Sequence, residues 1–252
     1  MKVWNNLAEW RAARATPEIA GRAIGFVPTM GALHTGHRAL LARARADNDI
    51  VVMSIFVNPA QFNDTADLVA YPRTIDADLA LARGLVDHVI APNAAEMYPD
   101  DYRYRVSESS CSRTLEGEHR PGHFDGMLTV VLRLLNIVQA NRAYFGEKDW
   151  QQLELVRGMV GAFFLPVEIV ACATERDPDG LALSSRNRRL SQAARVRAAD
   201  FPRVLRSAPD ATTAREELQA RGFDVDYVED VGGVRLGAIR LENVRLIDNV
   251  RL

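Results

Sequence analysis

Short apolar runs alternate with amphipathic stretches through residues 1–174, and this alternation limits the possible folds more than any other feature of the chain. The apolar runs, which we expect to be strands, are Ile24–Pro28, Ile50–Asn58, Asp87–Ala91, Ala143–Phe145 and Val167–Thr174. The stretches with helical spacing are Leu7–Ala15, Arg38–Ala46, Ile75–Arg83, Met127–Gln139 and Trp150–Gly161. The pattern predicts an α/β fold, a doubly wound parallel sheet of about five strands covered by helices.

The pattern changes after Asn187. The helices expected there are Ser191–Leu205 and Thr213–Arg221, and the strands are Val225–Val228, Val234–Ile239 and Val244–Ile247. We therefore expect a small C-terminal α/β cap domain, residues 188–252, joined to a catalytic domain, residues 1–187. One exposed strand is also expected earlier, at Tyr102–Val106, where the residues alternate.

The composition argues against several classes of function. The formal net charge is -2, and acidic and basic residues are mixed along the chain. The chain therefore has neither a basic stripe that could bind a nucleic acid nor a polybasic segment that could bind a membrane. No apolar run approaches the ~20 residues of a membrane helix, and the N-terminus lacks the apolar core of a signal peptide. Cys111 and Cys172 have the spacing of neither a disulfide framework nor a zinc site. We expect a cytoplasmic protein with small-molecule partners.

The segment Phe26–His37, FVPTMGALHTGH, is the first candidate for a binding site. A strand ends there in a loop of small residues that opens a helix. A helix N-terminus presents free N–H groups and the positive end of the helix dipole, so it suits a phosphate. His34 and His37 can share one side of this entrance and donate hydrogen bonds to phosphate oxygens, while Gly36 allows a close approach. The alternative is that both histidines are ordinary loop residues.

Polar segments also follow three other expected strands. These are the residues after Val57 (Asn58 to Phe62), after Phe145 (Gly146 to Gln152) and after Thr174 (Arg176 to Asn187). The carboxyl ends of parallel strands meet at one edge of a sheet, so these amides, cations and hydroxyls should collect there and suit an anionic nucleotide with a polar acid. In the alternative interpretation, Asp149 and Gln152 form a capping box, and Ser184 and Ser185 only shape a turn.

The chain contains neither GxxxxGK[ST] nor GxGxxG, which disfavours a P-loop ATPase and a dinucleotide dehydrogenase. An HxGH nucleotidyl-transfer site remains possible on this topology. Here the chain resembles the pantothenate synthetase (pantoate–β-alanine ligase) family, over nearly all of residues 1–190. The resemblance is carried, in fixed order, by PTMGALHTGH (Pro28–His37), SIFVNPAQF (Ser54–Phe62), YPRT (Tyr71–Thr74), RPGHFDG (Arg120–Gly126), FGEKDWQQL (Phe145–Leu153) and DGLALSSRN (Asp179–Asn187).

This resemblance implies a Rossmann-like, homodimeric enzyme that uses ATP and Mg²⁺ to convert pantoate into pantoyl adenylate and then joins it to β-alanine. The catalytic residues it implies are His37, as proton donor, with His34, Lys148 and Arg186. The implied ATP contacts are Met30, Gly31, His34, Gly36, His37, Gly146, Glu147, Lys148, Asp149, Glu175, Leu183, Ser184, Ser185 and Arg186. Those for pantoate and β-alanine are Gln61, Gln152, Met30, Asn58 and Arg120. The metal ligands stay open.

These residue types suit the implied chemistry. A carboxylate approaching a triphosphate meets a repulsion of roughly 4 kcal/mol per charge pair at contact, even at an effective dielectric near 20, which Lys148, Arg186 and the metal must offset. Two alternatives remain: a nucleotidyltransferase that releases a stable nucleotidylated product, and a silent nucleotide-binding protein. Tyr71, His119 and His123 could line the site or simply pack. For His88, within a strand, we expect a structural role.

Overall fold

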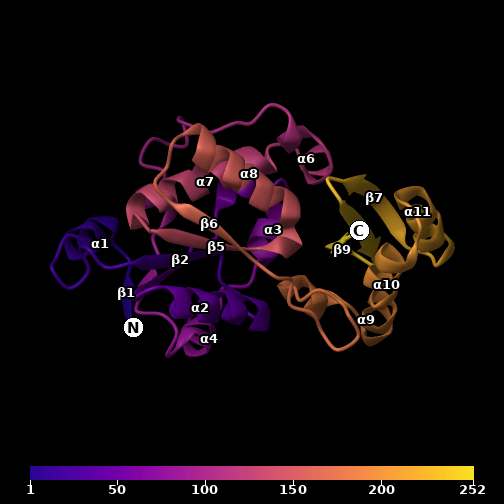
Figure 1. Cartoon of the computed structure of the whole chain (residues 1–252), viewed down its shortest axis with the longest axis horizontal. Helices are drawn as coiled ribbons and strands as arrows, with labels where there is room; N and C mark the ends of the chain where they lie inside the picture. The colour runs from indigo at the N-terminus through magenta and orange to yellow at the C-terminus, as the bar shows by residue number, and fades with distance from the viewer. The chain divides into compact units, whose positions relative to one another are not determined.

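The computed structural model describes all 252 residues, and its central feature is a six-stranded parallel sheet (Figure 1). Its strands are β1 (Lys2–Trp4), β2 (Ile24–Thr29), β3 (Ile50–Ile55), β4 (His88–Ile90), β5 (Arg142–Gly146) and β6 (Glu168–Cys172). They lie in the order β1-β4-β3-β2-β5-β6, and every neighbouring pair is parallel. The chain moves outward from β2 through β3 to β4 and, in the opposite direction, from β5 to β6. The predicted doubly wound α/β fold is therefore confirmed, with its switch point between β2 and β5.

Helices cover both faces of this sheet because the strand side chains alternate between two cores. The helices are α1 (Leu7–Arg14), α2 (Thr35–Asp47), α4 (Ile75–Ala82), α7 (His123–Val138) and α8 (Trp150–Ala162). Ile24 and Phe26 of β2 are buried in the core that α1, α7 and α8 complete, whereas Val27 is buried in the core beneath α2 and α4. Figure 1 shows α7 and α8 above the sheet and α2 and α4 below it.

The region between β3 and α7 contains several short helices that the apolar pattern did not predict. They are η1 (Pro59–Gln61), α3 (Thr65–Ala70), α5 (Ala94–Met97), η2 (Cys111–Arg113) and α6 (Glu116–His119). The strand predicted at Tyr102–Val106 is wrong. Asp101 and Tyr102 adopt positive φ angles of 52° and 59°, and the Asp100 carboxylate accepts a hydrogen bond from the Tyr104 N–H at 2.8 Å, so the chain turns there instead of extending.

The C-terminal part forms a second, antiparallel sheet with three helices. Its elements are α9 (Gln192–Ala198), α10 (Asp200–Ser207), α11 (Ala211–Ala220), β7 (Asp224–Val231), β8 (Val234–Leu241) and β9 (Val244–Arg251). The strand order is β7-β8-β9, so the three predicted strands are confirmed and each is longer than expected. The helix predicted at Ser191–Leu205 is in fact two helices. Pro202, which has no N–H to continue the α9 ladder, lies in the first turn of α10, where a proline is tolerated.

The chain divides into two compact units. The first comprises Met1–Leu33, His37–Gly146 and Gln151–Cys172, and contains the parallel sheet. The second comprises the antiparallel sheet and its helices within Ala173–Leu252, and also two short segments, His34–Gly36 and Glu147–Trp150. The predicted boundary at residue 187 between a catalytic domain and a cap stays a prediction. None of the helices combines the length and the apolar character needed to cross a bilayer.

Candidate functional site

The loop that leaves β2 is fixed by buried polar contacts within the first unit. The Thr29 hydroxyl donates to the carbonyl of Ser54 at 2.6 Å and accepts from the Gly31 N–H at 3.2 Å. Gly31 has a φ of +81°, and a Cβ there would lie 2.9 Å from a carboxylate oxygen of Asp78. Only glycine suits this position, which carries the chain toward the histidine pair.

Asp78 of α4 organises the same loop, and the sequence analysis did not identify it. Its carboxylate is 2% exposed and accepts hydrogen bonds from the backbone N–H groups of Ala32, at 3.1 Å, and Leu33, at 2.7 Å. The Thr74 hydroxyl donates to both of its oxygens at 3.3 Å. The only sequence signal is a carboxylate on the otherwise apolar inner face of this helix. Asp78 therefore fixes the residues directly before His34.

His34 is held as a neutral hydrogen-bond donor. It directly precedes α2, and its Nδ1 accepts the Gly36 N–H at 3.1 Å. A Cβ on Gly36 would lie 2.9 Å from the imidazole, so a larger residue there would displace the ring from this position. Burial, and then the charges of Lys148 and Arg188, lower the pKa of His34 to about 4, although Asp149 opposes this shift. At neutral pH the proton of this ring is assigned to Nε2, because Nδ1 is an acceptor.

His37 is the third residue of α2, and its side chain is half-buried. The predicted helix entrance is present, because α2 begins at Thr35, between the two histidines. His34 and Gly36 belong to the second compact unit, whereas His37–Gly146 belongs to the first.

The Lys148 segment is a 3₁₀ turn, η3 (Glu147–Asp149), at the start of α8. Asn249 of β9 orders it: its Nδ2 donates to the carbonyl oxygens of Glu147 and Lys148, both at 2.9 Å. The Lys148 ammonium lies 3.9 Å from the Asp149 carboxylate, and its side chain is 19% exposed. No capping-box hydrogen bond joins Asp149 to Gln152. Lys148 is thus a partly buried cation on a turn that is held by hydrogen bonds from Asn249.

The segment after β6 folds back on itself. The carbonyl of Glu175 accepts the Leu183 N–H at 2.9 Å, so the backbone of Glu175 is ordered whatever its side chain does. Ser184 caps a second 3₁₀ turn, η4 (Ser185–Arg189), by accepting the Arg186 N–H at 3.3 Å. Arg188 of this turn is the second cation that lowers the pKa of His34. Arg186 was predicted as a site residue and Arg188 was not, because nothing in the run SRNRR distinguishes its three arginines.

Arg176 anchors this segment to β9. Its guanidinium makes a bidentate ion pair with Asp248, at 2.7 and 2.9 Å, and the Asp248 carboxylate is 1% exposed. The same guanidinium donates to the carbonyl of Asn249 at 3.1 Å. Arg176 thereby supports the residue that braces the Lys148 turn. The second unit thus brings His34, Lys148 and Arg188 together. Arg176 was predicted only as the first residue of a polar segment after a strand, and Asn249 was not predicted.

A separate cluster of amides lies in the first unit, beyond β3. Asn58 is fully enclosed, and its Nδ2 donates to the Gln61 Oε1 at 3.0 Å. The Nε2 of Gln61 lies 3.1 Å from the Met30 sulfur, and its side chain is nearly buried. Because all of the Asn58 amide is used by protein partners, any contribution to a ligand passes through Gln61. Gln152, by contrast, is half-buried, and its side-chain amide makes no hydrogen bond within the protein.

Arg120 adjoins this cluster through a histidine. It donates to the His123 Nε2 at 3.0 Å, and His123 therefore uses its Nδ1–H to donate to the carbonyl of Gln61 at 2.8 Å. His123 is thus a buried structural contact that orders Gln61. Tyr71 packs edge-on against Phe62 at 5.7 Å. The structural role expected for His88 is confirmed, since its Nδ1 accepts the Trp4 indole N–H at 3.3 Å.

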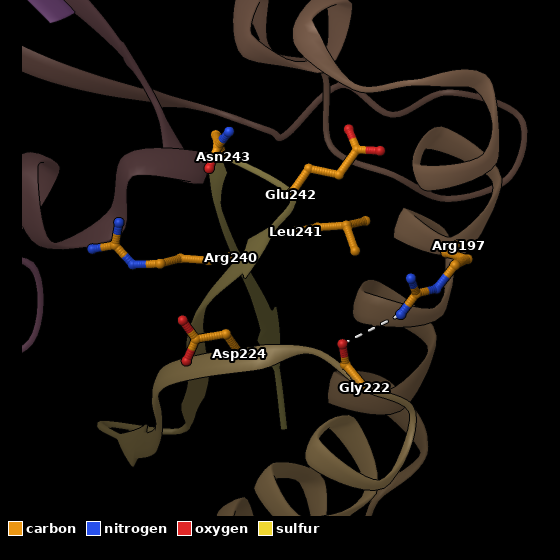
Figure 2. Close-up of a pocket in the computed structure, with 7 residues that line it drawn as sticks. All are labelled: Arg197, Gly222, Asp224, Arg240, Leu241, Glu242 and Asn243. Carbon is orange, nitrogen blue, oxygen red and sulfur yellow. Dashed lines mark hydrogen bonds between the residues drawn. The ribbon is translucent and has the colours of Figure 1, made fainter. Parts of the chain in front are cut away.

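Two cavities of the structure lie away from these residues. One, of about 510 Å³, is in the second unit (Figure 2) and is lined by Arg197, Gly222, Asp224, Arg240, Leu241, Glu242 and Asn243. Three of its charged groups have protein partners: Arg197 donates to the carbonyl of Gly222, Arg240 donates to Asp226, and Glu242 accepts from Ser191. The other, of about 290 Å³, lies where β5 and β6 begin, the opposite edge from the ligand crevice of such a sheet. No group of three or more His, Cys, Asp or Glu side chains forms a metal cage.

Comparison with known proteins gives consistent matches along the whole chain. The family model described as Pantoate-beta-alanine ligase matches residues 2–251. The pantothenate synthetase of Bdellovibrio bacteriovorus is 55% identical over 230 residues, which cover 91% of this chain and 92% of that protein. The pantothenate synthetase of Legionella pneumophila is 46% identical over 255 residues, with complete coverage of both chains.

Solved structures give the same result. The pantoate-beta-alanine ligase of Francisella tularensis, complexed with beta-gamma ATP and beta-alanine, is 38% identical and superposes with a TM-score of 0.94 over all of this chain and 97% of that one. The pantothenate synthetase of Thermus thermophilus is 42% identical, with a TM-score of 0.91 over all of this chain and 99% of that one.

Proposed function

This chain belongs to the pantoate–beta-alanine ligase family, and from that premise we propose that it joins pantoate to β-alanine in two steps driven by ATP. The observation that carries the proposal is the neutral His34, whose ring accepts the Gly36 N–H and whose pKa is lowered by burial and by the charges of Lys148 and Arg188. Such a cluster suits a polyphosphate, because it combines two positive charges with an uncharged donor. The beta-gamma ATP and the beta-alanine bound by the Francisella relative support the same substrates here.

In the first step, a carboxylate oxygen of pantoate attacks the α-phosphorus of ATP. An O–P bond forms, the bond between the α-phosphorus and the bridging oxygen breaks, and pyrophosphate leaves with the electron pair. Both reactants are anionic, so Lys148, Arg186 and Arg188 lower the barrier by offsetting their repulsion. Mg²⁺ enters as part of the substrate MgATP, with phosphate oxygens as its main ligands.

The two histidines take different roles in this scheme. His34, neutral at pH 7, donates a hydrogen bond through Nε2 and adds no charge. His37, in the first turn of α2, is the proposed proton donor to the departing pyrophosphate. The remaining ATP contacts come from backbone and small side chains: Met30, Gly31, Gly36, Gly146, Glu147, Asp149, Glu175, Leu183, Ser184 and Ser185.

Pantoate is proposed to lie against the amide cluster. Gln61 offers an N–H, Gln152 offers an amide without a protein partner, and Met30 supplies an apolar wall for the branched methyl groups. Arg120 contributes through His123, which orders Gln61, and Asn58 contributes through its hydrogen bond to the Gln61 side chain. Uncharged amides can hold a hydroxyl and a carboxylate without adding charge beside the phosphates.

In the second step, the amine of β-alanine attacks the carbonyl carbon of pantoyl adenylate. A C–N bond forms, the C–O bond to AMP breaks, and the nitrogen loses a proton. The test is a mixture of enzyme, MgATP and pantoate, in which we expect about one pyrophosphate per competent site, followed by turnover to pantothenate and AMP once β-alanine is added. Steady pyrophosphate release without β-alanine, with a free nucleotidylated product, would instead identify a nucleotidyltransferase.

Two further features belong to this proposal. We propose a homodimer, which sedimentation at micromolar concentration tests, and a cytoplasmic location, which fractionation of the source cells tests. We also propose that residues 1–187 form the catalytic domain and that residues 188–252 form a cap domain.

A further inference from the structure

The side-chain amide of Asn58 has a fully occupied set of hydrogen bonds inside the first unit. Its Oδ1 accepts the Tyr98 hydroxyl at 2.6 Å and the Ala60 N–H at 3.2 Å. Its Nδ2 donates to the Gln61 Oε1 at 3.0 Å and to the Gly126 carbonyl at 3.1 Å. The side chain is 0% exposed, so water cannot replace any of these partners.

These partners allow only one orientation of the Asn58 amide. The Ala60 N–H can only donate, and the Gly126 carbonyl can only accept. A flipped amide would face the Ala60 N–H with its NH₂ group and the Gly126 carbonyl with its oxygen, leaving these two buried backbone groups unsatisfied. Close packing preserves the arrangement, because a Cβ on Gly126 would lie 2.1 Å from the carbonyl oxygen of Ala60.

The orientation of Asn58 determines that of Gln61. Since Asn58 donates, the Gln61 Oε1 must face it, and the Nε2 must face the other way. On that side the protein offers only the Met30 sulfur, at 3.1 Å, and a thioether is a weak acceptor. Gln61 therefore presents an N–H whose best partner would be a ligand oxygen.

Tyr98 is the remaining member of this chain of hydrogen bonds. Its ring is 8% exposed and packs edge-on against Tyr102 at 5.2 Å, while the Arg133 guanidinium lies 4.9 Å from its centre. The ring therefore holds its hydroxyl against Asn58. Burial raises the pKa of Tyr98 well above its ordinary value, so this hydroxyl remains a donor at any physiological pH.

We propose that Tyr98 is a positioning residue which, through Asn58, fixes the amide of Gln61 so that it donates an N–H to an oxygen of pantoate. The proposal rests on the proposed function, because it concerns the acid that this cluster binds. Tyr98 does not touch the substrate; its hydroxyl supplies the second hydrogen bond that holds the Asn58 Oδ1, and the Asn58 amide in turn sets which end of the Gln61 amide faces the ligand. An acid that offers an oxygen acceptor at this point is therefore selected over one that offers a donor.

The decisive variant is Tyr98→Phe, with Tyr102→Phe as the matched control on the neighbouring ring. The measurement is the initial rate of pyrophosphate release at varied pantoate and varied MgATP. We expect Tyr98→Phe to raise the KM for pantoate about tenfold and to leave the KM for ATP within about twofold, because only the acid faces Gln61. Tyr102→Phe should change neither KM. An unchanged KM for pantoate, or equal rises in both KM values, would overturn the proposal.

A measurement on the wild-type protein tests the same series of hydrogen bonds, from Tyr98 through Asn58 to Gln61, even if Tyr98→Phe does not fold. In nitrogen-resolved NMR, the side-chain NH₂ of Asn58 should exchange with D₂O far more slowly than that of Gln61, and pantoate should shift the Gln61 signal most. Rapid exchange at Asn58, or no response at Gln61, would count against the proposal. If the wild-type enzyme makes no pantothenate, the proposed function itself fails; if it does and Tyr98→Phe matches it, only this inference fails.

Discussion

A carboxylate oxygen of Asp78 accepts the backbone N–H of Leu33 at 2.7 Å, across 45 positions of the chain. The same carboxylate also accepts the N–H of Ala32, so helix α4 fixes the loop that delivers His34. Neither N–H could reach water if the carboxylate were absent, because Ala32 and Leu33 are buried. The geometry of the proposed phosphate site therefore depends on a residue outside the motif that contains the histidines.

We predict that Asp78→Ala lowers both stability and adenylation. Two buried N–H groups lose their acceptor, which should cost about 3 kcal/mol in the free energy of unfolding by urea. The KM for ATP should rise more than the KM for pantoate, since the released loop leads to His34. The matched control is Asp76→Ala, on the same helix but exposed, which should change stability by less than about 1 kcal/mol. Equal effects from both variants would contradict the prediction.

The second prediction concerns the coupling between Lys148 and His34. The variant Lys148→Met removes a charge that lowers the pKa of His34, so that pKa should rise above about 4 in an NMR titration. The same variant should nearly abolish adenylate formation, yet spare the capture of supplied pantoyl adenylate by β-alanine. Only the first step must overcome the repulsion between a carboxylate and a triphosphate. Equal losses in both steps would show that Lys148 has a different role.

Local pattern predicted most of the fold, and its failures have local physical causes. The strand at Ile50–Ile55 was predicted, as Ile50–Asn58, because a strand buried on both faces is apolar throughout. β1 was missed because Lys2–Trp4 is too short to show a period. Tyr102–Val106 alternates like a strand, but the Asp100 carboxylate turns the backbone. One continuous helix was predicted across Pro202. The break between α9 and α10 was missed because a proline is tolerated in the first turn of a helix, and the sequence alone does not show where α9 ends.

The site was predictable only where its residues are contiguous in sequence. His34 and Lys148 lie in segments that follow β2 and β5, so the topology pointed to those segments, and the family resemblance then singled out the two residues. Asn249 contacts the Lys148 turn from 101 positions away, and no spacing rule relates the two. Asp78 and Tyr98 act by the same kind of long-range hydrogen bond. Such partners could not be predicted from the sequence, because their roles depend on burial and on the distance between residues that are far apart in the chain.

The third prediction concerns Asn249. In Asn249→Leu, the carbonyl groups of Glu147 and Lys148 lose their shared donor, so the turn that holds Lys148 should loosen. We expect a loss of about 1–2 kcal/mol in stability and a fall in the rate of adenylation larger than any rise in the KM for pantoate. Asn243→Leu, an asparagine of the same sheet at the β8–β9 turn, is the control. An unchanged adenylation rate in Asn249→Leu would show that the turn holds its shape without this brace.

The last prediction is a pH dependence that follows from His34. In the folded protein this imidazole takes up its proton only near pH 4, whereas in the unfolded chain it does so near 6.5. Between these values the unfolded chain binds more protons, so stability falls as the pH is lowered from about 6.5 to 4, and this group adds no further loss below that. Because the ring is partly solvated, we expect about 1–2 kcal/mol. The control is His34→Asn, whose Oδ1 can still accept the Gly36 N–H but which cannot titrate. Between pH 6.5 and 4 the free energy of unfolding of the wild-type protein should fall relative to that of His34→Asn. If urea unfolding gives a difference between the two proteins that is the same at every pH, His34 is protonated equally well in the folded and unfolded states.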